Sequence, residues 1–265
     1  MKFLIEPFLT LYKNRRVLLA TTMVDIKSRY AGSVMGLIWM VLYPILFLAA
    51  YSFVYVFILK VQVSDMTPVE YIILIFSGLV PFLGFSEGLA VSTSAITSNA
   101  SLVKNTLFPI AVIPVKAVLS TQSIEVVGMI LLLVASAATG RLSVYTLLLF
   151  PVWVLQLLFG AGVGWIVASI NVLAKDLQSM IGLISLFIMM ISPIAYRADS
   201  VDGVLAVFLK LNPLYYFITV YQNCFLFAQL PPTSVLVIMV AFSIGIFCLG
   251  YAFFQKMSQL FADNI

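Results

Sequence analysis

Long runs of apolar residues, separated by short polar stretches, recur along the whole chain. A helix needs roughly 20 apolar residues to cross a bilayer core that is ~30 Å thick. The pattern predicts six such segments, at residues 34–59, 71–98, 109–138, 145–172, 179–195 and 233–254. The fifth is short, because its apolar run stops at Ser192-Pro193 and Arg197 follows closely. We therefore expect one all-α integral membrane domain over residues 1–265, with six transmembrane helices over 34–254.

Residues 1–33 differ from the rest because their apolar positions follow a helical period. Leu19, Met23, Ile26 and Tyr30 recur at i, i+4, i+7 and i+11, whereas the charged residues lie mostly off this stripe. The pattern predicts an amphipathic, cytoplasmic interface helix in the plane of the membrane. A solvated basic leader that only sets the orientation of the chain is the alternative. The segment lacks the continuous apolar core and the small-residue cleavage site of a signal peptide.

Residues 196–232, ahead of the last apolar run, fit neither pattern. A short apolar piece, 204–211, is followed by Asn212-Pro213 and by a second apolar piece, 214–230. A helix of ~16 residues is only ~24 Å long at 1.5 Å per residue, which is shorter than the bilayer core. We expect two half-depth helices that return to the outer face. A seventh full span is the alternative, and it would place the C-terminus outside.

Positive residues are unequally divided between the two sides of this six-span topology. The N-terminal side carries ten, which are Lys2, Lys13, Arg15, Arg16, Lys27, Arg29, Lys104, Lys116, Lys175 and Lys256. The other side carries four, which are Lys60, Arg141, Arg197 and Lys210. Cytoplasmic loops carry the excess of Lys and Arg, so both termini are predicted to be cytoplasmic. Six of the fourteen lie in the first 29 residues, which indicates a membrane surface rather than nucleic acid.

The composition agrees with a membrane domain and narrows its chemistry. Of the residues, 63% are hydrophobic and 9% are charged, whereas soluble domains carry about 25% charged residues. The chain has no histidine, which excludes Ser-His catalysis and the usual His-bearing zinc sites. Cys224 and Cys248 lie in separate apolar segments, where we expect buried fillers. No GxxxxGK[ST] loop occurs, so a nucleotide site is not expected.

Three charged residues fall inside predicted spans, where an unpaired charge is costly and therefore a functional candidate. Lys116 lies near the cytoplasmic end, and we expect its side chain to snorkel to the interface. Glu87 and Glu125 lie deeper. Without a matched partner, they could carry a coupling ion or serve as hydrogen-bonded packing groups. Gly160 and Gly164 in the fourth span have the spacing that lets helices approach closely.

The first apolar run carries the most unusual pattern, an aromatic residue at every fourth position. We name this set the aromatic ladder, and it consists of Trp39, Tyr43, Phe47, Tyr51 and Tyr55. Each ring is turned only ~40° from the last, so the five follow one side of the helix. Aromatic belts normally mark only the two interfaces. A ladder through the whole thickness predicts a path for a ligand with apolar faces and many hydroxyls, and a chance run that faces lipid or another helix is the alternative.

Several motifs resemble those of one family. The segment Asp25-Ile-Lys-Ser-Arg-Tyr-Ala-Gly-Ser33, which runs into Met35-Gly-Leu-Ile-Trp39 and Tyr43-Pro44, resembles the start of the polysaccharide-exporting ABC-2 permeases. These are the Wzm-type O-antigen, teichoic-acid and capsule exporters. Further similar motifs follow in order, namely Lys104-Asn-Thr-Leu-Phe-Pro109, Lys175-Asp176-Leu177, Ser192-Pro-Ile-Ala-Tyr196 and Asn212-Pro213-Leu214.

The resemblance implies a homodimer in the bacterial inner membrane that exports a lipid-linked polysaccharide. Each subunit would dock on a separate cytoplasmic ABC ATPase, present in two copies, which binds ATP and Mg²⁺, so that this chain needs no metal, cofactor or catalytic residue of its own. The interface helix and short cytoplasmic coupling helices would meet the ATPase. The matching positions are Asp25, Arg29, Tyr30, Ser101, Leu102, Lys104, Asn105, Phe108, Lys175 and Asp176.

Other functions stay open at this point. An ABC-2 exporter of a drug or an unglycosylated lipid would use the same architecture. A membrane-embedded enzyme that acts on a lipid-linked sugar would turn over its substrate without ATP. An ion-coupled carrier would need Glu87 or Glu125 and a proton gradient.

Overall fold

The computed structural model describes residues 2–29, 31–36, 38–58, 60, 66–104, 108–197, 201 and 203–261, and these contain helices and no strands. Five of the helices are long and apolar enough to cross a membrane. They are Ile38–Ile58 (α3, Ile38–Ser52, continued by a π-helix), Pro68–Thr93 (α4), Val112–Ala138 (α7), Val144–Leu173 (a short 3₁₀ turn and then α8, Leu149–Leu173) and Thr233–Leu260 (α12, Thr233–Met257, and a 3₁₀ turn). Five of the six predicted segments are thus confirmed as long apolar helices.

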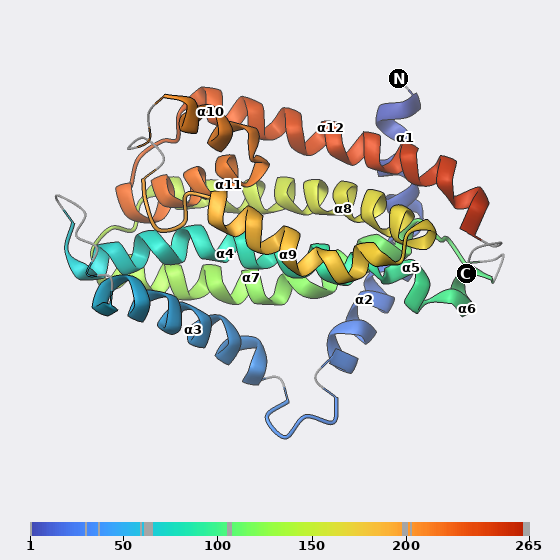
Figure 1. The fold of residues 1–265 in the computed structure, drawn as a ribbon, viewed down its shortest axis with the longest axis horizontal. Coiled ribbons are helices and arrows are strands. Elements are labelled where there is room, and N and C mark those ends of the chain that lie inside the picture. The colour runs from blue at the N-terminus through green and yellow to red at the C-terminus, as the bar shows by residue number, and fades with distance from the viewer. Residues whose placement is uncertain are drawn as a thin grey trace.

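The fifth predicted segment forms a shorter helix. Helix α9, Asp176–Ile191, has 16 residues, a length of ~24 Å at 1.5 Å per residue. Ile181 is its one buried residue. Helix α9 packs on α4 and α8, and in Figure 1 it crosses the direction of α4 at a shallow angle. The helix ends where the sequence predicts, because Ser192 is extended and Pro193 cannot continue the α-helical hydrogen bonds.

The predicted break at Asn212-Pro213 is confirmed. Helix α10, Val204–Leu211, meets α11, Pro213–Gln222, at a bend of 94°, and a π-helical turn extends α11 to Phe227. The Asn212 side chain caps α11 by accepting a hydrogen bond from the Leu214 N–H at 3.0 Å, and Pro213 occupies the first turn. In Figure 1 the two pieces lie at the left end of the bundle, above α4.

The N-terminal segment is helical, as expected. Helices α1, Lys2–Lys13, and α2, Arg15–Arg29, are separated at Asn14 and run across one end of the bundle (Figure 1). Helix α1 is anchored on α12, because the Thr10 and Tyr251 hydroxyls are 2.8 Å apart and the rings of Phe8 and Phe247 are 4.8 Å apart. Most large apolar side chains of α1 and α2 are exposed, including Leu19 and Met23 of the predicted stripe. That this exposed face lies against the membrane stays a prediction.

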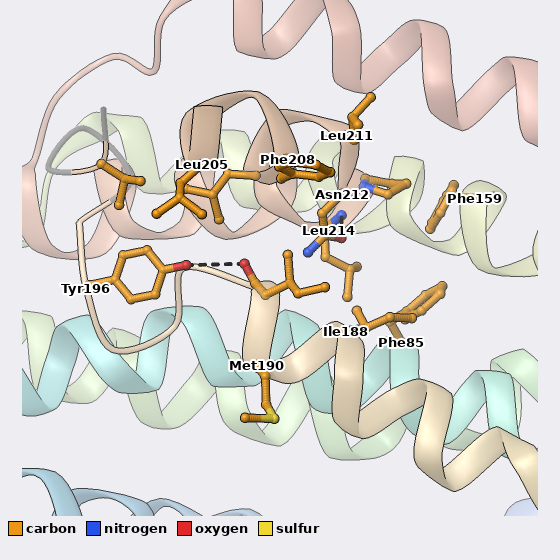
Figure 2. Close-up of a pocket in the computed structure, with 14 residues that line it drawn as sticks. Phe85, Phe159, Ile188, Met190, Tyr196, Leu205, Phe208, Leu211, Asn212 and Leu214 are labelled. Carbon is orange, nitrogen blue, oxygen red and sulfur yellow. Dashed lines mark hydrogen bonds between the residues drawn. The ribbon is translucent and has the colours of Figure 1, made fainter. Parts of the chain in front are cut away.

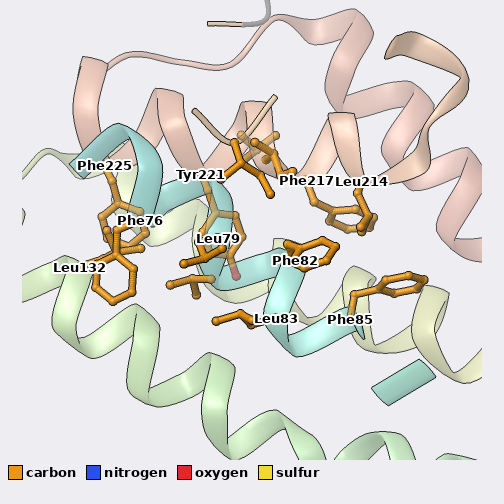
Figure 3. Packing of buried hydrophobic residues seen from close by; sticks show 14 of the residues in the cluster. Phe76, Leu79, Phe82, Leu83, Phe85, Leu132, Leu214, Phe217, Tyr221 and Phe225 are labelled. Atoms are coloured by element: carbon orange, nitrogen blue, oxygen red, sulfur yellow. The ribbon is translucent and has the colours of Figure 1, made fainter. Parts of the chain in front are cut away.

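Helix α4 is the centre of the domain. Of its most apolar 18-residue stretch, 83% is buried, whereas the corresponding figure for the first apolar helix, Ile38–Ile58, is 11%. A helix that is hydrophobic all round needs neighbours on every side, and α4 packs on α3, α7, α8, α9 and α11. Figure 3 shows the cluster, in which side chains of α4 meet Leu132 of α7 and Leu214, Phe217, Tyr221 and Phe225 of α11 and its extension.

Small residues let α8 approach its neighbours closely, as the glycine spacing predicts. A side chain at Gly164 would crowd Ser92 of α4, and one at Gly160 would press on Val118 of α7. On the opposite side of α8, a Cβ at Gly162 would overlap the backbone of α12 at Ile246. Helices α8 and α12 therefore touch backbone to backbone, which any larger residue at this position prevents.

Candidate functional site

Four residues of the aromatic ladder, from Tyr43 to Tyr55, form a row of neighbouring rings along α3 and its π-helical extension, Phe53–Ile58. Successive ring centroids are 6.2 Å apart between Tyr43 and Phe47, 6.4 Å between Phe47 and Tyr51, and 4.8 Å between Tyr51 and Tyr55. The last two rings are stacked, and their hydroxyls are 3.5 Å apart.

The ladder lies at the border between the protein core and the exposed side of the first apolar helix. Phe47, Tyr51 and Tyr55 are partly buried and pack against the large cluster, whereas Trp39 and Tyr43 are about 40% exposed. Only Pro44 and Ser52 of α3 are buried. The ladder thus offers a continuous row of rings and hydroxyls with one side uncovered in a single chain.

An ion pair stands at the start of the ladder. Arg29, near the end of α2, donates to Glu87 of α4 at 2.9 Å, and a cavity of about 220 Å³ beside this pair is also lined by Trp39, Tyr43 and Ile124. Glu87 therefore has a cationic partner, which the spacing in the sequence did not reveal. An unpaired intramembrane carboxylate was the basis for considering Glu87 as an ion carrier, and that basis is removed.

A second ion pair joins α2 to α7. Lys116 Nζ lies 3.1 Å from Asp25 of α2 and 3.4 Å from Asn99 Oδ1. The Lys116 side chain is only 6% exposed, so the expectation that it snorkels to the interface is wrong. The reason is tertiary, since α2 covers the place where the ammonium group would otherwise meet water. Asp25 and Arg29, predicted to contact an ATPase, thus hold α2 against α7 and α4.

Most of the other predicted contact residues lie at the same end of the bundle. Ser101 and Lys104 are exposed on or next to α6, Ala100–Val103, which follows the equally short α5, Ala95–Ser98. Leu102 and Phe108 are half-buried and pack against a second apolar cluster that includes Trp165 and Phe247.

The remaining predicted contacts complete this surface. Lys175 and Asp176 are exposed where α9 begins, at the end of the bundle where α5 and α6 also lie (Figure 1). Tyr30 and Asn105 lie outside the described residues. Two short helices and two exposed lysines, Lys104 and Lys175, are therefore gathered at one end.

Glu125 has a different environment from Glu87. It is fully buried, accepts a hydrogen bond from the Tyr221 hydroxyl at 2.9 Å and another from Gln156 at 2.7 Å, and contacts Gly84. Gln156 also donates to the Pro81 carbonyl of α4 at 3.0 Å. Glu125 thus connects α7 with α8 and α11 as a hydrogen-bonded packing group.

A large cavity of about 970 Å³ lies on the other side of α4 and α8, under α10 (Figure 2). Its lining is apolar, with Phe85, Phe159, Phe208 and several aliphatic side chains. Among the described residues, the two polar side chains of the lining are already engaged, because the Tyr196 hydroxyl donates to the Ile191 carbonyl at 3.2 Å and Asn212 donates to Ser192 at 2.8 Å. The part of the lining that the structure describes therefore offers few groups that recognise a polar ligand.

Comparison with known proteins identifies the family. The family model described as ABC-2 type transporter matches residues 16–226. A Myxococcus xanthus protein named O-antigen export system permease protein RfbA is 28% identical over 258 residues, which cover 96% of this chain and 97% of the relative. A Klebsiella pneumoniae protein of the same name is 26% identical over 255 residues, with 93% and 94% covered. The resemblance inferred from the motifs is confirmed, and the chain belongs to the ABC-2 type transporter family.

Proposed function

We propose that this chain is the transmembrane permease subunit of an ATP-driven ABC transporter that exports a lipid-linked, O-antigen-like polysaccharide across the bacterial inner membrane. Family membership supports the transporter class, and the names of end-to-end relatives support the substrate class. The aromatic ladder, a row of rings with one side uncovered, is the observation that carries the proposal in this chain.

The proposed topology has six spans and two cytoplasmic termini. Helices α3, α4, α7, α8 and α12 cross the membrane, and α9 is the sixth span despite its 16 residues, because the bilayer can thin around a short helix. The bent pair α10 and α11 stays at the outer side. The division of ten positive residues against four supports this orientation.

The functional unit in this proposal is a homodimer. The first apolar helix and α9 expose large apolar side chains, among them Phe53, Phe57, Leu183 and Phe187. Exposed apolar faces of this kind can meet lipid or a second copy across a two-fold axis. A second copy would enclose the open side of the aromatic ladder, so that the two ladders line one path.

The aromatic ladder suits a sugar chain on chemical grounds. A pyranose has apolar faces that stack on aromatic rings and hydroxyls that bond to Tyr, so each ring offers a temporary contact. The ladder itself carries no charge that would hold one position too strongly. The same walls could pass a drug or an unglycosylated lipid, which are the alternative cargoes.

ATP hydrolysis belongs to a separate cytoplasmic ATPase in two copies, which binds ATP and Mg²⁺. The exposed surface around Lys104 and the turn at Lys175 and Asp176 would receive that partner. Its closure would push α5 and α6, which lie next to α7, and the ion pairs of Asp25 and Arg29 would make α2 move with α7 and α4. This transfer would open the path.

The test compares two variants of Tyr51 in the aromatic ladder by the amount of protein in the membrane and by surface polysaccharide. We expect Tyr51→Ala to keep normal amounts of protein in the membrane and to lose most surface polysaccharide, and Tyr51→Phe to retain most export because the ring remains. A fully buried aromatic would instead cost roughly 3–5 kcal/mol on truncation, and the protein would disappear. Normal export by a stably expressed Ala variant of Phe47, Tyr51 and Tyr55 together would rule out the path.

A further inference from the structure

The small cavity beside Arg29 and Glu87 differs in kind from the large apolar one. Its about 220 Å³ are lined by those two residues, by Trp39 and Tyr43 of the aromatic ladder, and by Ile124 of α7. Drug-sized ligands occupy pockets of ~300–1,000 Å³, so this cavity suits a ligand of one ring. The cavity lies beside Trp39 and Tyr43, the first two residues of the aromatic ladder, at the N-terminal end of α3.

The lining offers several free hydrogen-bonding groups. Arg29 uses Nη1 for Glu87 Oε1. Within the described ranges, the Trp39 indole N–H, the Tyr43 hydroxyl and the second Glu87 oxygen have no hydrogen-bond partner. The cavity therefore combines two flat rings, donors and acceptors with the buried apolar side chain of Ile124.

The charge of the site favours one part of the proposed substrate, the neutral sugar ring, over the other, the phosphate or pyrophosphate group. Arg29 alone would attract a phosphate or pyrophosphate group. Glu87 balances that charge and would repel an anion in the same cavity, since like charges in contact are unfavourable. A neutral ring with hydroxyls meets no such penalty, because it can donate to the carboxylate and accept from the guanidinium.

The Arg29–Glu87 pair keeps accessible surface. The two side chains are 22% and 38% exposed, so a ligand in the cavity can reach both charged groups. The pair stands, moreover, at the start of the aromatic ladder, where a sugar chain would enter.

We propose that this cavity is a binding subsite for one neutral pyranose ring of the exported glycan, at the cytoplasmic entrance of the aromatic ladder. The inference rests on the proposed function. Trp39 and Tyr43 stack on the pyranose ring. The Glu87 carboxylate accepts hydrogen bonds from the sugar hydroxyls, and the Arg29 guanidinium donates to the sugar and also holds Glu87 in place. Glu87 is thus a specificity-determining residue that favours sugar over phosphate.

The test uses the full-length chain in nanodiscs and follows tryptophan fluorescence during titration with five probes and a competitor. The probes are the methyl glycosides of glucose, mannose, galactose, rhamnose and N-acetylglucosamine, and the competitor is inorganic pyrophosphate. We expect at least one glycoside to change the fluorescence, and Trp39→Phe to remove that change. Glu87→Gln should weaken glycoside binding at least ten-fold and strengthen pyrophosphate binding.

A matched control separates the local effect from the loss of a charge. Glu6 is an exposed carboxylate of α1, far along the interface segment from the cavity, and Glu6→Gln should leave both affinities unchanged. The proposal is overturned if no glycoside binds, if pyrophosphate binds the unaltered chain more tightly than every glycoside, or if Glu87→Gln behaves like Glu6→Gln. If one of these three binding results is found and Tyr51→Ala still loses export, the proposed export path is kept and only the subsite proposal is rejected.

Discussion

Replacing Asp25 with Asn should destabilise the protein through Lys116. The ammonium group of Lys116 is nearly buried, with the Asp25 carboxylate at 3.1 Å and the Asn99 side-chain oxygen at 3.4 Å. Asn keeps the size and the carbonyl acceptor of Asp but removes the negative charge. The Asp25→Asn variant therefore leaves a cation in a largely dry place without its counter-charge.

The magnitude follows from the burial of the two partners. Removing one partner of a fully buried pair costs about 3–5 kcal/mol. The Asp25 side chain is 33% exposed, so water already screens part of the attraction, and we expect a loss of about 2 kcal/mol in unfolding free energy. A chain of this size shifts its melting temperature by roughly 2–4 °C per kcal/mol, which gives a decrease of ~4–8 °C.

The control removes the cation as well. Lys116→Met has a similar volume and carries no charge, and the partly exposed Asp25 that remains can be hydrated. We expect the double variant Asp25→Asn, Lys116→Met to regain most of the lost stability, because neither charge is left unpaired. Thermal unfolding in detergent, followed by intrinsic fluorescence, measures all four proteins, and copurification of the ATPase is measured on the same samples.

The result also separates two roles for Asp25. If Asp25 touches the ATPase rather than supporting Lys116, the Asn variant keeps its melting temperature and loses the partner, and Lys116→Met does not rescue it. An unchanged melting temperature for Asp25→Asn, or a double variant no more stable than that single one, would refute the reasoning.

Three further predictions concern the partner surface, the topology and the packing. Lys104→Glu reverses an exposed charge, so the ATPase should no longer copurify while the melting temperature stays within about 1 °C, as expected for a surface substitution; unchanged copurification would remove this surface from the proposed contact. In a background without Cys224 and Cys248, a cysteine at position 175 should react only with reagent added from the cytoplasm and one at position 141 only from outside, and the reverse pattern would contradict the topology. Gly162→Ala should lower stability by about 1–3 kcal/mol because its Cβ would overlap the α12 backbone, whereas the same change at Gly182, which faces open space, should be neutral in thermal unfolding; equal effects would contradict the close contact.

Features set by a local run of residues could be predicted from the sequence. The apolar runs identified five long helices and the short α9, because burial in lipid or protein requires a continuous apolar segment. The break at Asn212-Pro213 followed from the chemistry of two adjacent residues, and the spacing of the aromatic ladder followed from the helical period. None of these depends on where another part of the chain lies.

The ion pairs could not be predicted in the same way. Asp25 and Lys116 are 91 positions apart, and Arg29 and Glu87 are 58 positions apart. Each residue had a sensible local interpretation, as an ATPase contact, a snorkelling lysine or an ion carrier. Only the packing of α2 against α4 and α7 brings the opposite charges together and creates the small cavity between them.

The uneven burial of the spans indicates which parts of the domain can move. Helix α4 has neighbours on all sides, and α8 and α12 are in backbone contact, so a shift among these helices would lose dense packing. Helix α3 buries only Pro44 and Ser52, and α9 only Ile181. Elements with few buried contacts can rearrange at low cost. If a path opens during transport, we therefore expect α3 and α9 to move against a fixed core of α4, α7, α8 and α12, and the aromatic ladder on α3 would move with the wall of the path.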